Sequence, residues 1–298
     1  MHLAPLSNEV IFKNAFSDEE VLEAFVKDVS GLDFHAHKIE TERQFAEPIG
    51  GINIRYDIFA ESEDGRVIVE LQRVRYDTHF DRFLHYFLAS IVEQAKSAKE
   101  YQIEKKVITI VVLTSPYKTR DLSGALIEDP VLVSDLDPRT LSGKYLPIFG
   151  HRLYFLNARY SLEGVPEPLQ AWLRLVKASL DAPEVKDEEA LRKLIGPGSP
   201  AVFRAAQRSL WDGLTPEQRT AVIESNEAEK AVATYIADLD EALRLKEVER
   251  RLKEEALSLK DEALRLKDEA LRLKDDALAK ADAMRQKLID LGMDPEAL

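Results

Sequence analysis

Two carboxylates and an amide fall on neighbouring extended segments near residue 60. Residues 52–60 and 66–73 are predicted as strands, because both are rich in β-branched and aromatic residues and Asp64-Gly65 between them is a typical hairpin turn. If residues 62–65 form a four-residue loop, Asp57 lies directly opposite Glu70. Alternate residues of a strand share a face, so Gln72 lies on the same face as Glu70.

This arrangement suggests a metal site. Two carboxylates that face each other across a hairpin repel, and a divalent cation removes the repulsion. Hard oxygen ligands favour Mg²⁺, which binds through one or two carboxylates and keeps water molecules for a phosphate substrate. The alternative is that Asp57 and Glu70 are ordinary charged residues on a solvent-exposed face of the hairpin.

Helices and a buried strand surround the hairpin in the sequence. Helices are predicted over residues 8–16, 17–31 and 79–101 from the spacing of their apolar residues, with Ser17 as the cap of the second and Gly31 as its end. The nearly continuous β-branched run 107–113 is typical of a strand buried on both faces, and a further strand is expected at 152–157. These elements predict an α/β domain over residues 1–160.

The rest of the chain is predicted to be helical. Residues 161–240 form a helical connector with helices at 169–180, at 200–211 and from 216 onward, separated by Pro and Gly. Residues 241–290 carry a seven-residue repeat that predicts a coiled coil and self-association through residues 242–288. The repeat has one column of leucines, a column of alanines and a second leucine column (Leu245, Leu252, Leu259, Leu266 and Leu273; Ala256, Ala263 and Ala270; Leu257, Leu264 and Leu271). Parallel, antiparallel and higher-order association, and an intramolecular helical hairpin, all remain open.

Composition excludes several classes of protein. The 298 residues contain no cysteine, so disulfides, thiolate zinc sites, iron–sulfur clusters and cysteine nucleophiles are ruled out, and a reducing cytoplasm is the expected location. We find no apolar run long enough to span a membrane and no secretory signal at the N-terminus. The net charge of −13 argues against nucleic-acid binding, but residues 66–120 carry ten Lys and Arg against six Asp and Glu.

The order of the motifs in residues 8–160 resembles the PD-(D/E)XK nuclease family transposases, also called recombination-promoting nucleases. The resemblance rests on Asp57 followed by Glu70-x-Gln72, on the opening Glu-x-x-Phe-Lys-x-x-Phe at 9–16, and on later aromatic and basic motifs (Phe80-x-Arg82, Tyr86, Ala98-x-x-Tyr101 and Lys105-Lys106). The sequence departs from the family pattern at three positions: Tyr56 replaces the motif proline, Gln72 replaces the superfamily lysine, and Ala98 replaces a glycine.

The resemblance implies a restriction-endonuclease-like core, with a central mixed sheet flanked by helices, and Mg²⁺-dependent cleavage of DNA phosphodiesters. Asp57 and Glu70 would hold Mg²⁺, Gln72 would orient a water or a phosphate oxygen, and Glu9 is a further candidate acid, unless it only stabilises a helix start. Candidate DNA contacts are Arg73, Arg75, Arg82 and Tyr86. Because Gln72 brings no positive charge, the alternative is an inactive relative that acts as a DNA-binding or coiled-coil assembly module.

Overall fold

The computed structural model describes residues 1–44, 53–72, 79–95, 102–117 and 119–290. The chain forms two compact units, Met1–Glu227 and Ala228–Leu298. The predicted Arg73 and Arg75 contacts and the Ala98-x-x-Tyr101 motif lie outside the described residues.

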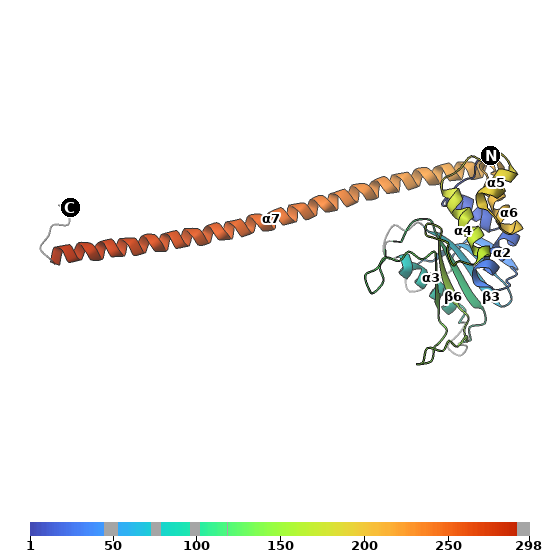
Figure 1. Ribbon diagram of the computed structural model, residues 1–298, viewed down its shortest axis with the longest axis horizontal. Coiled ribbons are helices and arrows are strands. Elements are labelled where there is room, and N and C mark those ends of the chain that lie inside the picture. Colours follow the sequence, from blue (N-terminus) through green and yellow to red (C-terminus); the bar gives the residue numbers. More distant parts are fainter. Residues whose placement is uncertain (45–52, 73–78, 96–101, 118, 291–298) are drawn as a thin grey trace. The chain divides into compact units, whose positions relative to one another are not determined.

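A six-stranded mixed sheet forms the centre of the first unit (Figure 1). Its strands are β1 (Lys38–Gln44), β2 (Arg55–Glu61), β3 (Gly65–Gln72), β4 (Lys106–Leu113), β5 (Val131–Asp135) and β6 (Arg152–Asn157), in the order β1-β2-β3-β4-β6-β5. The central pairs β3–β4 and β4–β6 are parallel, and the other pairs are antiparallel. The predicted central mixed sheet is therefore confirmed, and β1 and β5 are strands that the sequence pattern did not predict.

The hairpin of β2 and β3 has the predicted register. Ile58 pairs with Val69 and Glu61 pairs with Arg66, which leaves residues 62–65 as the loop. The ladder ends at Ile58 and Val69, so Asp57 and Glu70 are the next residues along the two strands, and their direct opposition stays a prediction from the hairpin register.

Helices cover both faces of the sheet because side chains of each central strand alternate between two cores. On one face, Val67 and Val69 pack with α1 (Glu9–Phe16), α2 (Glu19–Ser30), α4 (Glu167–Leu180), α5 (Glu188–Ile195) and α6 (Pro200–Arg208). On the other face, Ile68 packs with Phe83 of α3 (His79–Val92). Strand β4 contributes to both cores, as its continuous apolar run predicted.

Several helix boundaries differ from the prediction, among them the start of α2 and the ends of α3 and α6, which stops at Arg208 rather than at residue 211. The side chain of Asp18, rather than that of Ser17, caps α2 by accepting a hydrogen bond from the Val21 amide. Gly31 ends this helix as expected, in the left-handed conformation with φ 73° that glycine adopts without strain. Helix α3 ends at Val92, well before residue 101.

The segment expected as a helical connector packs, up to Glu227, in the same unit as the sheet. Trp172 of α4 lies 5.1 Å from the Phe25 ring and 5.7 Å from the Phe16 ring, measured between centroids. Its indole N–H also donates to Asp28 at 2.8 Å. Aromatic packing therefore joins the helices after residue 160 to the first two helices.

The C-terminal half of the predicted helical region is one helix, α7 (Pro216–Asp290), which follows a short 3₁₀ turn (Trp211–Gly213). Its first residues belong to the first unit, where Val222 is buried. No described helix combines the length and apolar character needed to cross a membrane.

Candidate active site

The side chains of Asp57 and Glu70 each accept a hydrogen bond from a backbone amide of the opposite strand. Glu70 Oε1 accepts a hydrogen bond from the Asp57 amide at 3.0 Å, and Asp57 Oδ2 accepts one from the Leu71 amide at 2.9 Å. The regular β2–β3 pairing ends one residue earlier, at Ile58 and Val69. Where the strands separate, hydrogen bonds from backbone amides to these two carboxylates therefore replace the backbone–backbone hydrogen bonds of the ladder.

The backbone is irregular beside Asp57. Tyr56 and Ile58 would share a face in a regular strand, but Tyr56 lies in the α3-side core and Ile58 in the opposite core. On the neighbouring strand β1, Glu42 has a φ of 58°, an uncommon and strained conformation for a residue with a side chain. The break in alternation places Asp57 at the sheet end, within reach of side chains from both layers of helices.

Burial raises the pKa of both acids. Glu70 is only 1% exposed, and this desolvation, followed by the nearby Asp57 carboxylate, raises its pKa well above the usual 4.5. Desolvation is also the main cause that raises the pKa of Asp57, and the hydrogen bond from the Leu71 amide opposes it. A cation bound at this pair would stabilise the two charged forms that burial disfavours.

Lys13 of α1 provides a positive charge at this site, and the sequence-based site prediction did not include it. Its ammonium group contacts Glu9, lies 3.0 Å from Glu42 Oε1 and 3.8 Å from Asp57 Oδ1. Burial disfavours the charged ammonium, but hydrogen bonds with Glu9 and Glu42 outweigh this effect and raise the Lys13 pKa. The signal for Lys13 was present in the 9–16 motif, whereas nothing in the sequence singled out Glu42.

Glu9 reaches this cluster through Lys13. The two residues lie one turn apart in α1 and form an ion pair. Glu9 also occupies the first turn of the helix, where a negative charge is favoured by the helix dipole. Its position next to Lys13 keeps it as a candidate acid of the site.

Gln72 is held by a residue of the α3 layer. Arg82 donates to Gln72 Oε1 at 3.0 Å, and the Arg82 side chain is exposed. The Arg82 guanidinium also lies 5.1 Å from the Tyr86 ring centroid. Arg82 and Lys13 thus bring positive charge to the carboxylates from helices on opposite faces of the sheet, and the charges of both lower the pKa of Asp57.

Tyr86 lies in the protein interior. Its side chain is 7% exposed, and its ring packs edge-on against Tyr56 at 5.7 Å and against Phe83 at 6.0 Å. Its backbone carbonyl accepts the Tyr56 hydroxyl at 3.0 Å. These contacts are those of a core residue, and Tyr86 therefore offers little surface for the DNA contact that its place in the aromatic helix suggested.

The donor set at Asp57 and Glu70 fits a magnesium ion. Among the described residues, no group of three or more acidic or histidine side chains converges closely enough to hold a metal. Mg²⁺ needs only one or two carboxylates, because waters and substrate phosphate oxygens complete its octahedral shell. The buried acid pair matches that requirement.

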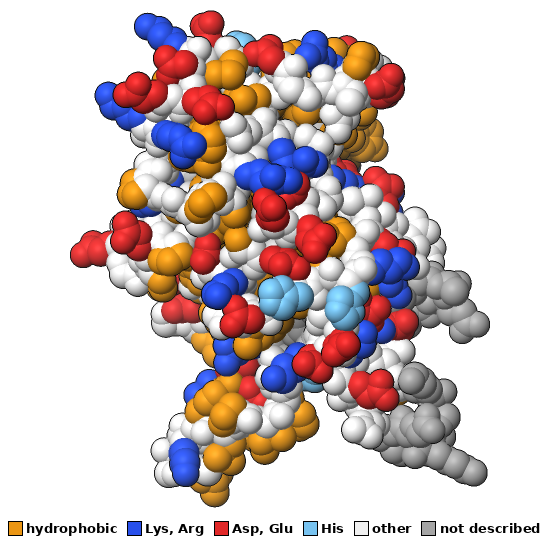
Figure 2. Space-filling model, turned by 90° about the vertical axis from the view of Figure 1, so that its right-hand side faces the viewer, with side chains coloured by type: hydrophobic (Ala, Val, Ile, Leu, Met, Phe, Trp, Pro, Cys, Tyr) orange, Lys and Arg blue, Asp and Glu red, His pale blue; other side chains and the backbone are white. Residues whose placement is uncertain are grey.

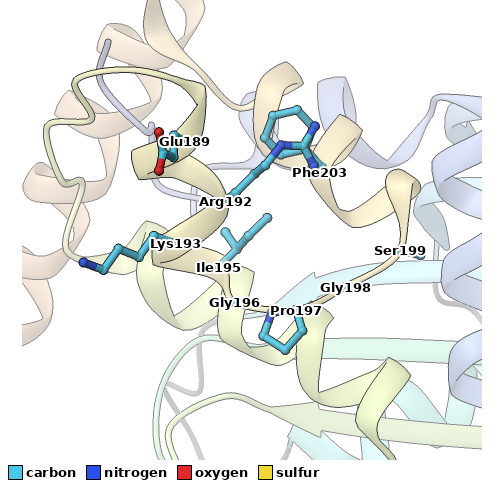
Figure 3. A pocket seen from close by; sticks show the side chains of 9 residues that line it. All are labelled: Glu189, Arg192, Lys193, Ile195, Gly196, Pro197, Gly198, Ser199 and Phe203. Atoms are coloured by element: carbon cyan, nitrogen blue, oxygen red, sulfur yellow. The ribbon is translucent and has the colours of Figure 1, made fainter.

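A separate pocket lies between α5 and α6 (Figure 3). It has a volume of about 550 Å³ and is formed by the loop from Ile195 to Ser199 together with Arg192 and Phe203. The Arg192 guanidinium stacks on the Phe203 ring at 3.5 Å. No strand residue lines this pocket, so it is distinct from the carboxylate pair.

The surface seen in Figure 2 carries acidic and basic side chains intermixed. A face of this kind provides no extended region of one charge for a phosphate backbone. Among the predicted DNA contacts, Arg82 is the basic residue within the described part of the chain, and it lies near the carboxylate pair.

Comparison with known proteins agrees with this geometry. The family model of the PD-(D/E)XK nuclease family transposases matches residues 8–193, which is more than half of the 298-residue chain. No curated protein and no solved structure matches the chain. The matched range includes the sheet, the Asp57–Glu70 pair and helix α1, and the chain belongs to the PD-(D/E)XK nuclease family transposases.

Proposed function

We propose that this protein is a Mg²⁺-dependent DNA endonuclease of the recombination-promoting, transposase-related type, which hydrolyses phosphodiester bonds. The observation that carries the proposal is the buried Glu70 carboxylate, which accepts a hydrogen bond from the Asp57 backbone amide at the end of the hairpin. Two neighbouring desolvated acids with raised pKa values are suited to hold a divalent cation.

Asp57 and Glu70 would hold the ion. When bound, Mg²⁺ supplies Lewis-acid polarisation of a phosphoryl oxygen and lowers the pKa of a coordinated water. The hydrogen bonds from the Asp57 and Leu71 amides fix the orientation of both carboxylates, so little rearrangement is needed for them to act as ligands.

Gln72 and Lys13 would together replace the superfamily lysine, Gln72 as a hydrogen-bonding group and Lys13 as a positive charge. Arg82 holds Gln72 Oε1 and so orients its amide, which can hydrogen-bond a water or a phosphate oxygen. Gln72 cannot supply the positive charge that stabilises a developing oxyanion. Lys13, 3.8 Å from Asp57, brings that charge from α1 instead. Glu9 and Glu42 would keep the Lys13 ammonium charged and in place.

The second candidate function is a catalytically inactive relative that binds DNA or assembles complexes through its C-terminal helix. Gln72 favours it, because this position lacks the charge of the superfamily lysine. The two functions differ in whether any Mg²⁺-dependent cleavage depends on Asp57 and Glu70.

A plasmid-nicking assay separates them. Purified protein is incubated with supercoiled DNA in Mg²⁺ or EDTA, beside the Asp57→Asn and Glu70→Gln variants. The endonuclease requires nicking in Mg²⁺ alone and its loss in both variants. Folded protein that gives no nicking would favour the inactive module, and nicking that both variants retain would indicate a contaminating nuclease.

Glu63→Gln and Asp64→Asn are matched controls. Both residues lie in the loop of the same hairpin and are exposed, so they change the charge by the same amount without touching the buried pair. These two variants are expected to nick like the unaltered protein.

A further inference from the structure

Helix α7 exposes a long apolar stripe. In the single chain Leu252 is 60% exposed, Leu259 61%, Leu266 60% and Leu273 64%. The helix contains neither Gly nor Pro between residues 217 and 290 and is unbroken, so its second half does not fold back on its first. The continuous helix thus differs from the intramolecular hairpin that the repeat left open, and a second molecule can supply a matching helix for the stripe.

The charge pattern beside the stripe determines which partner fits. With Ala256 and Leu259 at the a and d positions of the heptad, acidic residues occupy the g position and lysines the e position (Glu255, Glu262 and Glu269; Lys260, Lys267 and Lys274). In a parallel pair, each g residue faces the e residue five positions later in the partner. On each side of the seam, the three glutamates of one helix would then face the three lysines of the other, Glu255 opposite Lys260, for example.

An antiparallel pair would bring like charges together. There g faces g and e faces e, which sets glutamates against glutamates and lysines against lysines. Like charges along a whole seam disfavour that orientation. Each helix carries both the glutamate column and the lysine column. A second copy of this chain is therefore a complementary partner in the parallel orientation.

The lysines of the e position have no acidic residue three or four positions away, where an intrahelical ion pair would form. The residues three and four positions away from Lys260, Lys267 and Lys274 are alanine or leucine in every case. Intrahelical ion pairs of the kind that Arg250 forms with Glu247 and Glu254 are thus not available to this column. A neighbouring helix is the natural source of the carboxylates.

We propose that residues 252–277 of α7 bind the same residues of a second copy of this chain, as a parallel coiled coil in register. The alanines at the a position and the leucines at the d position form the seam (Leu252, Leu259, Leu266 and Leu273). The Glu–Lys pairs set orientation and register. A parallel arrangement attaches both nuclease units at the same end of the coiled coil, whereas an antiparallel one would attach them at opposite ends.

The mass of the full-length chain in solution tests the stoichiometry. Light scattering is expected to give the mass of two chains, and a variant with Leu259→Asp and Leu266→Asp the mass of one. Circular dichroism shows whether the variant remains helical. A mass of one chain, or of three or more, for the unaltered protein would overturn the proposal.

Single cysteines test orientation, because the chain has none of its own. Ala256→Cys at an a position and Leu273→Cys at a d position lie 17 residues apart, which is about 26 Å along the helix, whereas a disulfide needs Cα atoms within about 7 Å. Each variant alone is expected to form a cross-linked dimer under oxidation. Cross-linking only in a mixture of the two variants would show an antiparallel pair.

Ser258→Cys is the control for random collision, since Ser258 occupies the c position, away from the seam. It is expected to cross-link far less than Ala256→Cys. The charge columns are tested by changing Lys260, Lys267 and Lys274 to Glu together. Dissociation at low salt is expected, and an unchanged mass would contradict the role given to these pairs.

Discussion

Asp57 and Glu70 are joined by a crossed pair of hydrogen bonds: the amide of Asp57 donates to Glu70, and the amide following Glu70 donates to Asp57. Each carboxylate is therefore positioned by the opposite strand. A negative charge on Glu70 is disfavoured by burial and by the neighbouring Asp57, and its pKa is raised for both reasons.

Replacing Glu70 by Gln separates the metal function from the structural one. The Gln amide oxygen can still accept the Asp57 amide, while the buried negative charge is removed. We expect no Mg²⁺-dependent nicking and, in EDTA at pH 7, a melting temperature unchanged or higher by about 2–4 °C, as for a gain of about 1 kcal/mol in a unit of this size. Differential scanning calorimetry measures the shift, with Glu63→Gln as control; a marked fall in melting temperature would contradict this account.

Stability without metal should depend on pH through the same residue. The folded-state pKa of Glu70 is raised, so the folded protein binds the proton more tightly than the unfolded chain. The contribution of Glu70 is complete below its ordinary value of 4.5 and is lost as the pH rises through the raised pKa. Urea unfolding of the unaltered protein minus that of Glu70→Gln should give a free-energy difference that falls over this range. A flat difference would show that Glu70 is charged at every pH tested.

Lys13→Met tests the charge that α1 brings to the site. Removal of the ammonium leaves Glu9, Glu42 and Asp57 without their shared partner, and we expect a loss of about 1–3 kcal/mol in unfolding free energy. Nicking should fall about 100-fold, as when a charge-stabilising donor is lost. Mg²⁺ affinity, measured by calorimetry, should stay equal or increase, because a competing cation is gone.

A purely structural role for Lys13 would weaken Mg²⁺ binding together with nicking. Lys27→Met is the matched control, since Lys27 forms a comparable ion pair with Asp33 at 2.7 Å on the exposed surface. That variant is expected to leave both stability and nicking nearly unchanged, because solvent screens an exposed ion pair.

Arg82→Gln tests the connection between α3 and the β3 end. Arg82 is exposed and donates to Gln72, so its loss should weaken DNA binding and reduce the slope of log affinity against log salt by about one. Fluorescence anisotropy with a labelled duplex at several salt concentrations measures both. Lys186→Gln, an exposed residue before α5, is the control. An unchanged salt slope for Arg82→Gln would remove Arg82 from the DNA contacts.

Local sequence pattern was sufficient for the hairpin. The four-residue loop and the doubly buried strand β4 depend on period-two alternation and turn chemistry, which act between near neighbours. The heptad columns of α7 are likewise a local property of the sequence, and so the long helix could be predicted.

The burial of the acids and the position of Lys13 were decided by tertiary structure. The exposed-hairpin alternative is wrong for Glu70, which the fold buries, and no pattern within the hairpin encodes that burial. Strand β1, rich in charged residues, forms only because β2 offers it an edge, and its strained Glu42 then meets Lys13 from α1, 29 residues away in the chain. Contacts between distant segments depend on how whole elements pack, and the spacing of residues within one element carries no information about them.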